Sequence, residues 1–206
     1  MNFKRLYKNK KVLITGHTGF KGTWLTLWLI KSGAKIMGLS NGIPTKPSFF
    51  TMLRIKKKIL NVKCDVRNIN KLEKNILNFK PDYIFHFAAQ ALVKKSFIEP
   101  YNTWTTNSLG TINILESVRN VDKNINIIFS STVKAYGKMI NKSYKETTPL
   151  RGDLPDEVSK SAADLIAQSY VKTYGLKIGI IRSCNIYGPA DFNMDRLIPG
   201  TILNAL

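Results

Sequence analysis

A glycine-rich turn between a short apolar strand and a helix sets the architecture expected for this chain. Residues 11–15 read KVLIT, a β-branched run typical of a strand, and Gly16, Gly19 and Gly22 follow at a spacing of three. Residues 23–30 are then apolar at nearly every position, as in a buried helix. Glycines at such a turn let the backbone approach a pyrophosphate closely while the helix N–H groups face the anion. The turn predicts a dinucleotide site; a purely structural glycine turn is the alternative.

Strand-like and helix-like segments alternate along the rest of the sequence. Strands apolar on both faces that alternate with helices are typical of a parallel sheet covered on both sides. We therefore expect an α/β fold with a doubly wound, Rossmann-like parallel sheet in one domain over residues 1–206, with long loops at 41–50 and 138–155. Helical spacing occurs at 69–79, 103–118 and 158–174, and further strands are expected at 34–40, 59–65, 83–88, 126–131 and 177–182.

The charge balance is strongly basic. The chain has 32 Lys+Arg and 13 Asp+Glu, a net charge of +19, concentrated in residues 1–103. Such a charge attracts nucleic acid, nucleotide diphosphates or anionic membranes without choosing among them. No nucleic-acid motif or aromatic-interleaved basic stretch is present, so polyanion binding is the least favoured function.

Cysteine usage and hydropathy indicate the compartment. Cys64 and Cys184 are far apart and have no metal-ligand spacing, which predicts reduced thiols and no metal site. No signal-like apolar segment follows Met1, and no 18-residue apolar run occurs. We expect a cytoplasmic protein that does not associate with membranes or nucleic acid.

Four motifs together resemble the extended short-chain dehydrogenase/reductase superfamily. They are the glycine turn, CDVR at 64–67, HFAAQ at 86–90 and NSLGT at 107–111. Within that superfamily, four segments resemble the CDP-glucose 4,6-dehydratases, and the similarity runs almost from end to end of the chain. These segments are TGHTGFKGTW at 15–24, PTKP at 44–47, and NIYG at 185–188 with DRLIP at 195–199.

The resemblance implies NAD as the cofactor. Its pyrophosphate would lie at the glycine turn, its adenine near the end of the third strand, and its nicotinamide side near the end of the fourth. The second strand ends at 40–41 as Ser-Asn, without the acidic residue that grips a ribose hydroxyl, so the residues leave NAD or NADP open. The implied cofactor-binding residues are Gly16, Thr18, Gly19, Phe20, Lys21, Gly22, Asp65, Val66, Phe87, Ala88, Ala89 and Lys160.

The resemblance also implies a Tyr and a Lys four residues apart at the start of the long helix, where the phenolate takes the proton of the sugar 4-hydroxyl. Lys160 is present, but Asp156 stands at the position of the Tyr. A carboxylate with a reference pKa of about 3.9 is a weak base for an alcohol, and Lys160 would acidify it further. We expect an Asp156–Lys160 ion pair in place of the base.

A second departure follows the fifth strand. By resemblance, Thr132 would hydrogen-bond the 4-hydroxyl and Lys134 would serve proton removal at C5, while Val133 replaces the acid that protonates the departing 6-hydroxyl. Tyr136 is not at the position of the missing Tyr. Two further residues match substrate contacts of the family, Gln90 and Asn185.

Four other side chains have a packing interpretation. His17 is expected to be a loop residue rather than a metal ligand, and His86 to pack beneath the cofactor. Trp24 and Trp28, four apart on the first helix, are expected in the core rather than in a binding cage.

The function predicted is that of a CDP-glucose 4,6-dehydratase family member, a lyase that uses NAD to convert a nucleotide hexose to its 4-keto-6-deoxy form. Val133 and Asp156 predict weak or absent turnover. The alternative is a non-catalytic NAD-binding module or truncated relic, because most of the family's substrate-binding region would follow Leu206, where the chain stops. The apolar face of 158–174 could serve a homodimer or a buried contact equally well.

Overall fold

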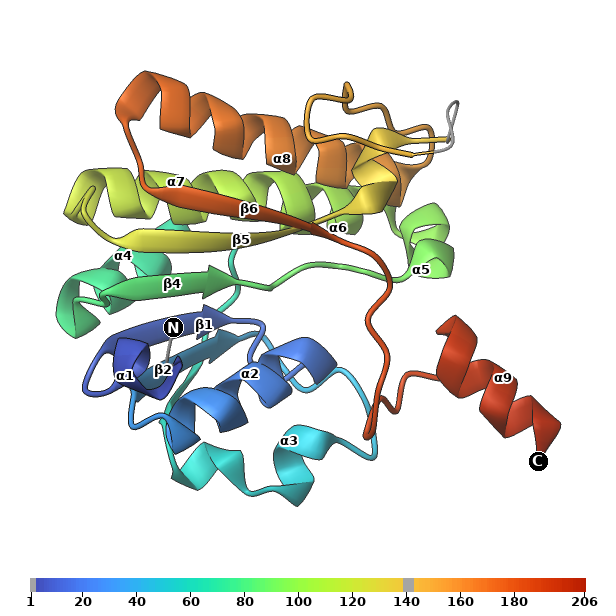
Figure 1. Cartoon of the computed structure of the whole chain (residues 1–206), viewed down its shortest axis with the longest axis horizontal. Helices are drawn as coiled ribbons and strands as arrows, with labels where there is room; N and C mark the ends of the chain where they lie inside the picture. The colour runs from blue at the N-terminus through green and yellow to red at the C-terminus, as the bar shows by residue number, and fades with distance from the viewer. Residues whose placement is uncertain (1–2, 139–142) are drawn as a thin grey trace.

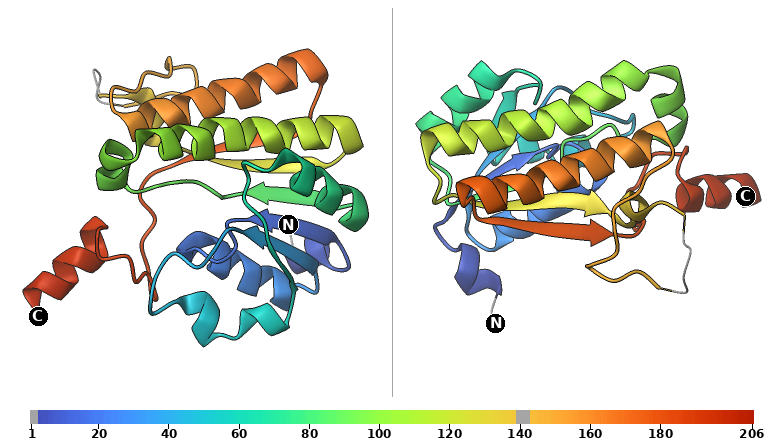
Figure 2. Two further views of the ribbon diagram at one scale, coloured as in Figure 1. Left: turned by 180° about the vertical axis from the view of Figure 1, so that it is seen from behind. Right: turned by 90° about the horizontal axis from the view of Figure 1, so that it is seen from above.

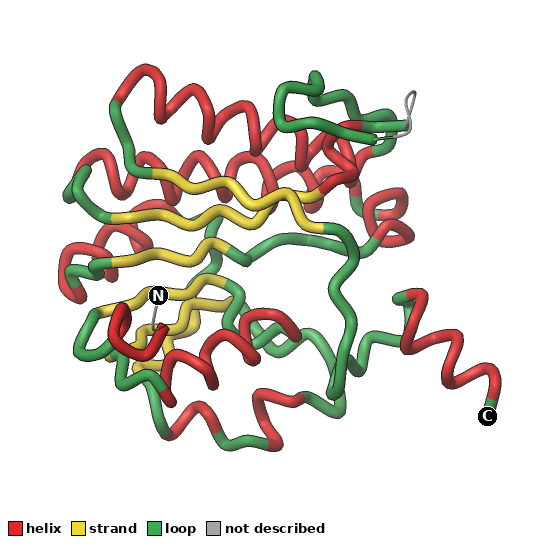
Figure 3. The backbone as a smooth tube through the Cα atoms, in the orientation of Figure 1, coloured by secondary structure: helices red, strands yellow, loops and turns green. Residues whose placement is uncertain are grey.

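One parallel sheet organises the chain, in a computed structural model that describes residues 3–138 and 143–206. Its six strands have the order β3-β2-β1-β4-β5-β6, and every neighbouring pair is parallel (Figures 1 and 3). The predicted doubly wound sheet is confirmed. The strands are β1 Lys11–Thr15, β2 Lys35–Ser40, β3 Leu60–Lys63, β4 Tyr83–His86, β5 Asn126–Thr132 and β6 Ile178–Ser183.

Helices cover both faces of this sheet (Figure 2). Because successive strand residues point to opposite faces, Leu13 of β1 belongs to the core under α4, α7 and α8, while Val12 and Ile14 face α1 and α2. All three side chains are fully buried. The face toward which Val12 and Ile14 point carries α1 Phe3–Tyr7, α2 Phe20–Lys31 and α3 Phe49–Met52. The face toward which Leu13 points carries α4 Ile69–Phe79, α7 Gly110–Val121 and α8 Pro155–Tyr174.

The strand order reverses between β1 and β4, which lie side by side at the centre of the sheet. From β1 the chain crosses to β2 and β3 on one side, and from β4 to β5 and β6 on the other. In open α/β sheets, ligands bind beyond the carboxyl ends of the strands at such a reversal. The turn that begins at Gly16 and the segment 87–90 both leave the sheet there.

Several helix boundaries differ from those expected. α8 begins at Pro155 rather than at residue 158, because proline suits the first helical position and Glu157 Oε2 accepts the backbone N–H of Leu154 at 3.4 Å. The expected helix 103–118 is a succession of α6 Pro100–Trp104, a π-helical segment and α7. The π-helical segment spans Thr105–Leu109.

Four short helices were not expected from the sequence. Helices this short are marginal in isolation and form where tertiary contacts support them, so periodicity gives little warning of them. They are α1, α3, α5 Val93–Ile98 and α9 Leu197–Ala205. α9 projects away from the rest of the molecule, and none of its residues is buried (Figures 1 and 2). Part of the expected loop 138–155 lies outside the described residues.

Among the described residues, the helices are too short or too polar for any of them to cross a membrane.

Candidate functional site

The glycine turn packs tightly against the end of β4. Gly16 has a φ of +73°, and a Cβ there would lie 2.8 Å from the backbone N of Ala88. A Cβ on Gly22 would collide with the Gly16 carbonyl oxygen. Gly19, which precedes the first turn of α2, is different: within the described residues its Cβ would meet only the Gly16 oxygen, at 3.4 Å. Two glycines therefore allow close backbone packing, and the third leaves the N-terminus of α2 open, which fits a pyrophosphate.

Thr15 fastens the end of β1 to the end of β4. Its hydroxyl accepts the backbone N–H groups of Phe87 and Ala88, both at 3.1 Å, and lies 2.7 Å from Nδ1 of His86. The Nε2 atom of His86 lies 3.2 Å from the Thr111 hydroxyl. Burial, and next the charge of Lys160, lower the pKa of His86 to about 3, so the imidazole is neutral. His86 is buried and is linked through Thr15 to the segment that carries Phe87, Ala88 and Ala89; that it packs beneath the cofactor stays a prediction.

The residues expected near the adenine lie at the end of β3. Val66 is buried and packs against Gly110, while Asp65 forms an ion pair with Arg67 at 2.6 Å. Hydrogen bonds from Arg67 lower the pKa of Asp65 to about 2 despite partial burial. Asn41, which follows β2, also donates to Asp65 at 3.4 Å. An ionised carboxylate therefore lies beside the end of β2, although that strand itself ends in Ser-Asn.

Thr18 and His17 tie the glycine turn to β2 and β3. Thr18 donates its hydroxyl to the Gly42 carbonyl at 2.7 Å. The His17 ring is fully buried, with Nε2 2.6 Å from the Asn61 side-chain oxygen, and it occupies the space that a side chain at Gly38 would fill. Burial lowers the pKa of His17. The expectation of a simple loop residue was incomplete, because the ring is part of the packing beneath the turn.

Asp156 pairs with a different lysine from the one expected. Its Oδ2 lies 3.4 Å from Nζ of Lys134, and among the described residues no ion pair joins it to Lys160. The predicted Asp156–Lys160 pair is therefore wrong. Spacing by four does place both residues on one helix face, but the chain after β5 brings Lys134 closer. The Thr132 hydroxyl accepts the backbone N–H of Lys134 at 3.3 Å, and Val133 begins the 3₁₀ helix Val133–Tyr136.

Lys160 is held in a desolvated and positively charged setting. Burial, and then the charge of Lys21, lower its pKa to about 8, against a smaller opposing effect of Asp156. Lys21 reaches from the first turn of α2 to β5, where its Nζ donates to the Ser130 hydroxyl at 2.9 Å and lies 5.5 Å from the centre of the Phe87 ring. Burial and the charge of Arg196 lower the pKa of Lys21 as well. The glycine turn and the end of β5 therefore share one cationic site.

The two expected substrate contacts lie in different surroundings. Both ends of the Gln90 side chain are engaged within the protein: Oε1 accepts from Leu92 N at 2.7 Å, and Nε2 donates to Oγ1 of Thr103 in α6 at 3.0 Å. Asn185 is exposed in the segment after β6. Asn107 belongs to the NSLGT motif, but the sequence did not predict its role: its buried amide exchanges hydrogen bonds with the Gln90 backbone at 2.8 and 3.0 Å.

Ser130 and the Asp164–Arg182 pair were also not predicted. Asp164 is fully buried, accepts from both Ser131 and Arg182, and ties α8 to β5 and β6. The Arg182 guanidinium also donates to the Tyr136 hydroxyl at 2.9 Å, so Tyr136 has a structural role. In the sequence, only the polar residues at the ends of the apolar runs of β5 and β6 could have pointed to these contacts.

The tryptophans of α2 are not in the core. Trp24 is 39% exposed and Trp28 is 54% exposed, and both line an apolar cavity of about 620 Å³ with Ile186 and Tyr187. Trp24 Nε1 donates to the Pro189 carbonyl at 3.1 Å. Their spacing correctly places them on one helix face, but spacing does not say which face meets the sheet.

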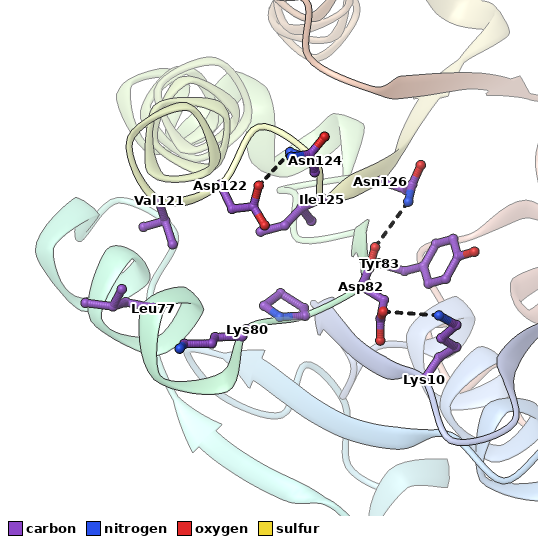
Figure 4. Close-up of a pocket in the computed structure, with 11 residues that line it drawn as sticks. Lys10, Leu77, Lys80, Asp82, Tyr83, Val121, Asp122, Asn124, Ile125 and Asn126 are labelled. Carbon is purple, nitrogen blue, oxygen red and sulfur yellow. Dashed lines mark hydrogen bonds and ion pairs between the residues drawn. The ribbon is translucent and has the colours of Figure 1, made fainter.

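A second cavity, of about 570 Å³, lies at the opposite, amino-terminal edge of the sheet (Figure 4). There Asp82 accepts from Lys10 Nζ at 3.3 Å and from the backbone N–H of Lys11 at 2.8 Å. These contacts hold the beginning of β1 to the beginning of β4. The described residues contain no cluster of side chains suited to a metal ion.

Comparison with known proteins gives a consistent family. The model of the GDP-mannose 4,6 dehydratase family matches residues 13–206. The chain is 35% identical to CDP-glucose 4,6-dehydratase of Salmonella typhimurium over 95% of its own length and 57% of that protein. It is 31% identical to CDP-paratose 2-epimerase of Salmonella typhi over 88% of the chain and 59% of the relative.

Solved structures agree. A dTDP-glucose 4,6-dehydratase of Streptomyces venezuelae, crystallised with NAD and TYD, has a TM-score of 0.83 at 27% identity over 95% of this chain and 62% of that one. The enzyme of the same name from Bacillus anthracis, in complex with NAD, has a TM-score of 0.82 at 29% identity, over 95% of this chain and 61% of that one. The chain thus spans somewhat less than two thirds of these relatives.

Proposed function

The chain belongs to the GDP-mannose 4,6 dehydratase family, within the nucleotide-sugar dehydratases and epimerases, and we propose that it binds NAD and a nucleotide sugar of the CDP-glucose class. The observation that carries this proposal is the open N-terminus of α2 at Gly19, held against the end of β4 by the close packing of Gly16. Neither polyanion binding nor a purely structural turn is favoured by this membership. We also propose that residues 1–206 form one cofactor-binding domain; cytoplasmic location and homodimer formation remain predictions.

The residues present fit a dinucleotide. Gly16, Thr18, Gly19, Phe20, Lys21 and Gly22 would hold the pyrophosphate, Asp65 and Val66 the adenine side, and Phe87, Ala88, Ala89 and Lys160 the nicotinamide side. When bound, NAD supplies reversible hydride acceptance. The chain supplies a cationic surface, because Lys160, with a pKa of about 8, is protonated at neutral pH.

The rate of dehydration depends on the side chains that give protons to the sugar and take protons from it. Thr132 can hydrogen-bond a sugar hydroxyl, but Lys134 is engaged by Asp156, and Val133 has no proton to donate. Position 156 carries an aspartate instead of the tyrosine that would act as the base. We therefore expect binding without efficient dehydration. A non-catalytic NAD and nucleotide-sugar-binding module is the second candidate, and the Lys134–Asp156 pair is the observation that favours it.

The test separates binding from turnover. Calorimetric titration should show NAD binding, and CDP-glucose should bind the NAD-loaded protein. Turnover is measured as the alkaline absorbance of a 4-keto sugar. The double variant Val133→Asp, Asp156→Tyr should raise it by about 10²-fold or more, the contribution of general acid–base catalysis. Val133→Asp, Asp153→Tyr, which places the phenol at an exposed position of the same segment, is the matched control.

Each outcome has a distinct meaning. Absence of NAD binding contradicts the proposed function as a whole. NAD and CDP-glucose binding without product in either double variant favours the non-catalytic module. Efficient turnover by the unmodified chain would show that Val133 and Asp156 are not the limiting residues.

A further inference from the structure

The helix α9 has an apolar face that the described part of the chain leaves uncovered. Ile198, Ile202 and Leu206 follow one another at a spacing of four, which places them on one side of the helix, and Leu203 borders them. The exposed fractions of these four side chains range from 40% to 101%. Amphipathic helices of soluble proteins normally bury such a face, so α9 has the properties of a docking helix.

A second exposed apolar surface lies on α2. It is the cavity of about 620 Å³ between α2 and the segment that follows β6, and we call it the α2 groove. Its walls are in contact with solvent, since Trp24 is 39%, Ile186 46% and Tyr187 68% exposed. The volume lies within the range of pockets that enclose a small ligand, so several side chains of a docking helix fit into it. Leu27 and Phe87 complete the apolar lining.

α9 does not reach the α2 groove of its own chain. The segment that leads to it is fastened by the Asp191 carboxylate, whose side chain is 3% exposed and which pairs with Arg196 at 3.0 Å. At the next residue, Asp195 lies 3.6 Å from Lys94 of α5. α9 then leaves the body of the molecule and points away from α2 and the sheet (Figures 1 and 2). Each chain therefore carries a docking helix together with a groove that this helix does not fill.

The distribution of charge favours a second copy of the chain as the occupant of the groove. Two chains of net charge +19 repel each other, and they do so least where the surfaces that meet carry no lysine. Residues 197–206 contain no charged side chain, and neither do residues 185–190 beside the groove. Of the two lysines in the lining, Lys21 is directed to Ser130 and Lys31 lies in the last turn of α2. The carboxyl end of a docked helix carries partial negative charge, which suits this lysine at the rim.

We propose that α9 of one copy packs into the α2 groove of a second copy and that the exchange is reciprocal, so that the protein forms a dimer by swapping α9. A two-fold axis makes the two contacts identical and closes the assembly at two chains. This interface lies on the face of the sheet that carries α2. It therefore differs from a dimer through α8, which lies on the opposite face. The inference does not depend on the binding of NAD or of a sugar.

Analytical ultracentrifugation of the full chain tests the proposal. Wild type should dimerise with a dissociation constant of about 1–100 µM, as expected for a small interface. Ile202→Lys places a charge in the apolar face and should weaken dimerisation by about 100-fold or more, because the change is present in both contacts. Asn204→Lys adds the same charge on the opposite side of α9 and should change the dissociation constant by less than about threefold. No residue of α9 is buried, so both variants should show the circular dichroism of wild type.

A mixing experiment tests whether the groove receives the helix. Ile186→Lys places a charge in the α2 groove and leaves α9 intact, so this variant alone should also be monomeric. An equal mixture of Ile186→Lys and Ile202→Lys chains should form a dimer that neither variant forms alone. One of its two contacts then joins an intact helix to an intact groove, so its dissociation constant should lie between those of wild type and the single variants.

Four outcomes would overturn the exchange of α9. The first is a wild type that stays monomeric up to about 100 µM. The second is a dimer that persists in Ile202→Lys, and its loss in Leu165→Lys, at an exposed position of α8, would place the interface there. The third is growth of the assembly beyond two chains, which indicates an open contact without two-fold closure. The fourth is a mixture in which no dimer forms. Binding of NAD, measured separately, reports on the proposed function alone.

Discussion

The Lys21 ammonium on α2 lies 2.9 Å from the Ser130 hydroxyl on β5. This contact connects the helix that follows β1 to β5, which is two strands away from β1 in the sheet. The Phe87 ring, at the end of the intervening β4, lies 5.5 Å from the same ammonium. The charge of Lys21, in the first turn of α2, is also the second cause, after burial, of the lowered pKa of Lys160.

Removing that charge should weaken dinucleotide binding. Lys21→Met should reduce NAD affinity by about tenfold, because a charge-assisted contact is worth about 1.5–3 kcal/mol and part of it is screened. Ser130→Ala keeps the ammonium and is the matched control, with an expected change below about threefold. Calorimetry at two salt concentrations measures both; an equal loss in the two variants would contradict a direct role for the charge.

Lys160 should lower the stability of the protein at neutral pH. Its pKa is about 8 in the folded chain and 10.5 in the reference state, so below pH 8 the folded state holds a proton at an energetic disadvantage. Stability should therefore rise as pH increases from 8 to 10.5. Lys160→Met should increase the free energy of unfolding by up to about 3 kcal/mol at pH 7, with the gain disappearing near pH 10.5.

Urea unfolding at several pH values measures this effect. Lys172→Met, at an exposed lysine of the same helix, is the control and should show no such pH-dependent gain. A constant difference between wild type and Lys160→Met across the range would mean that desolvation of the ammonium is not the cause.

His86 should make the protein sensitive to acid. Burial lowers its pKa from 6.5 to about 3, so the unfolded chain binds the proton first as pH falls. Stability should be independent of His86 above pH 6.5 and should decrease between pH 6.5 and 3, by up to about 5 kcal/mol. The variant His86→Gln loses packing at every pH but should show a flatter pH dependence.

The other histidine contributes in the same direction, because burial lowers the pKa of His17 as well. The double variant His17→Gln, His86→Gln should therefore be flatter than either single variant in urea unfolding from pH 7 to 4. Parallel curves for wild type and the double variant would show that carboxylates, not imidazoles, control acid unfolding.

Substitution at Gly16 should affect both folding and cofactor binding. Gly16→Ala introduces a Cβ 2.8 Å from the Ala88 backbone at a φ of +73°, which should cost about 2 kcal/mol or more of unfolding free energy and abolish measurable NAD binding. Gly42→Ala is the control, because no atom of the described residues lies within 4 Å of a Cβ placed at Gly42. Thermal unfolding and calorimetry test the pair; intact NAD binding in Gly16→Ala would contradict the close approach of the turn to the dinucleotide.

Local patterns were sufficient for the sheet and for the glycine turn at which we propose that the cofactor binds. Strand and helix periodicities are local properties, so KVLIT followed by three glycines already placed a strand, a turn and a helix in order. Alternation with apolar strands then implied parallel pairing. The same patterns did not predict α5 or α9, because short helices depend on the contacts that surround them.

The partners of individual side chains were decided by tertiary structure. Spacing by four puts Asp156 and Lys160 on one helix face, yet Asp156 pairs with Lys134, 22 residues earlier in the chain. Spacing likewise grouped Trp24 with Trp28 without showing that their face is exposed. The physical reason is the same in each case: periodicity along one element says which residues share a face, while the distance to a charge or to the core depends on how separate elements pack.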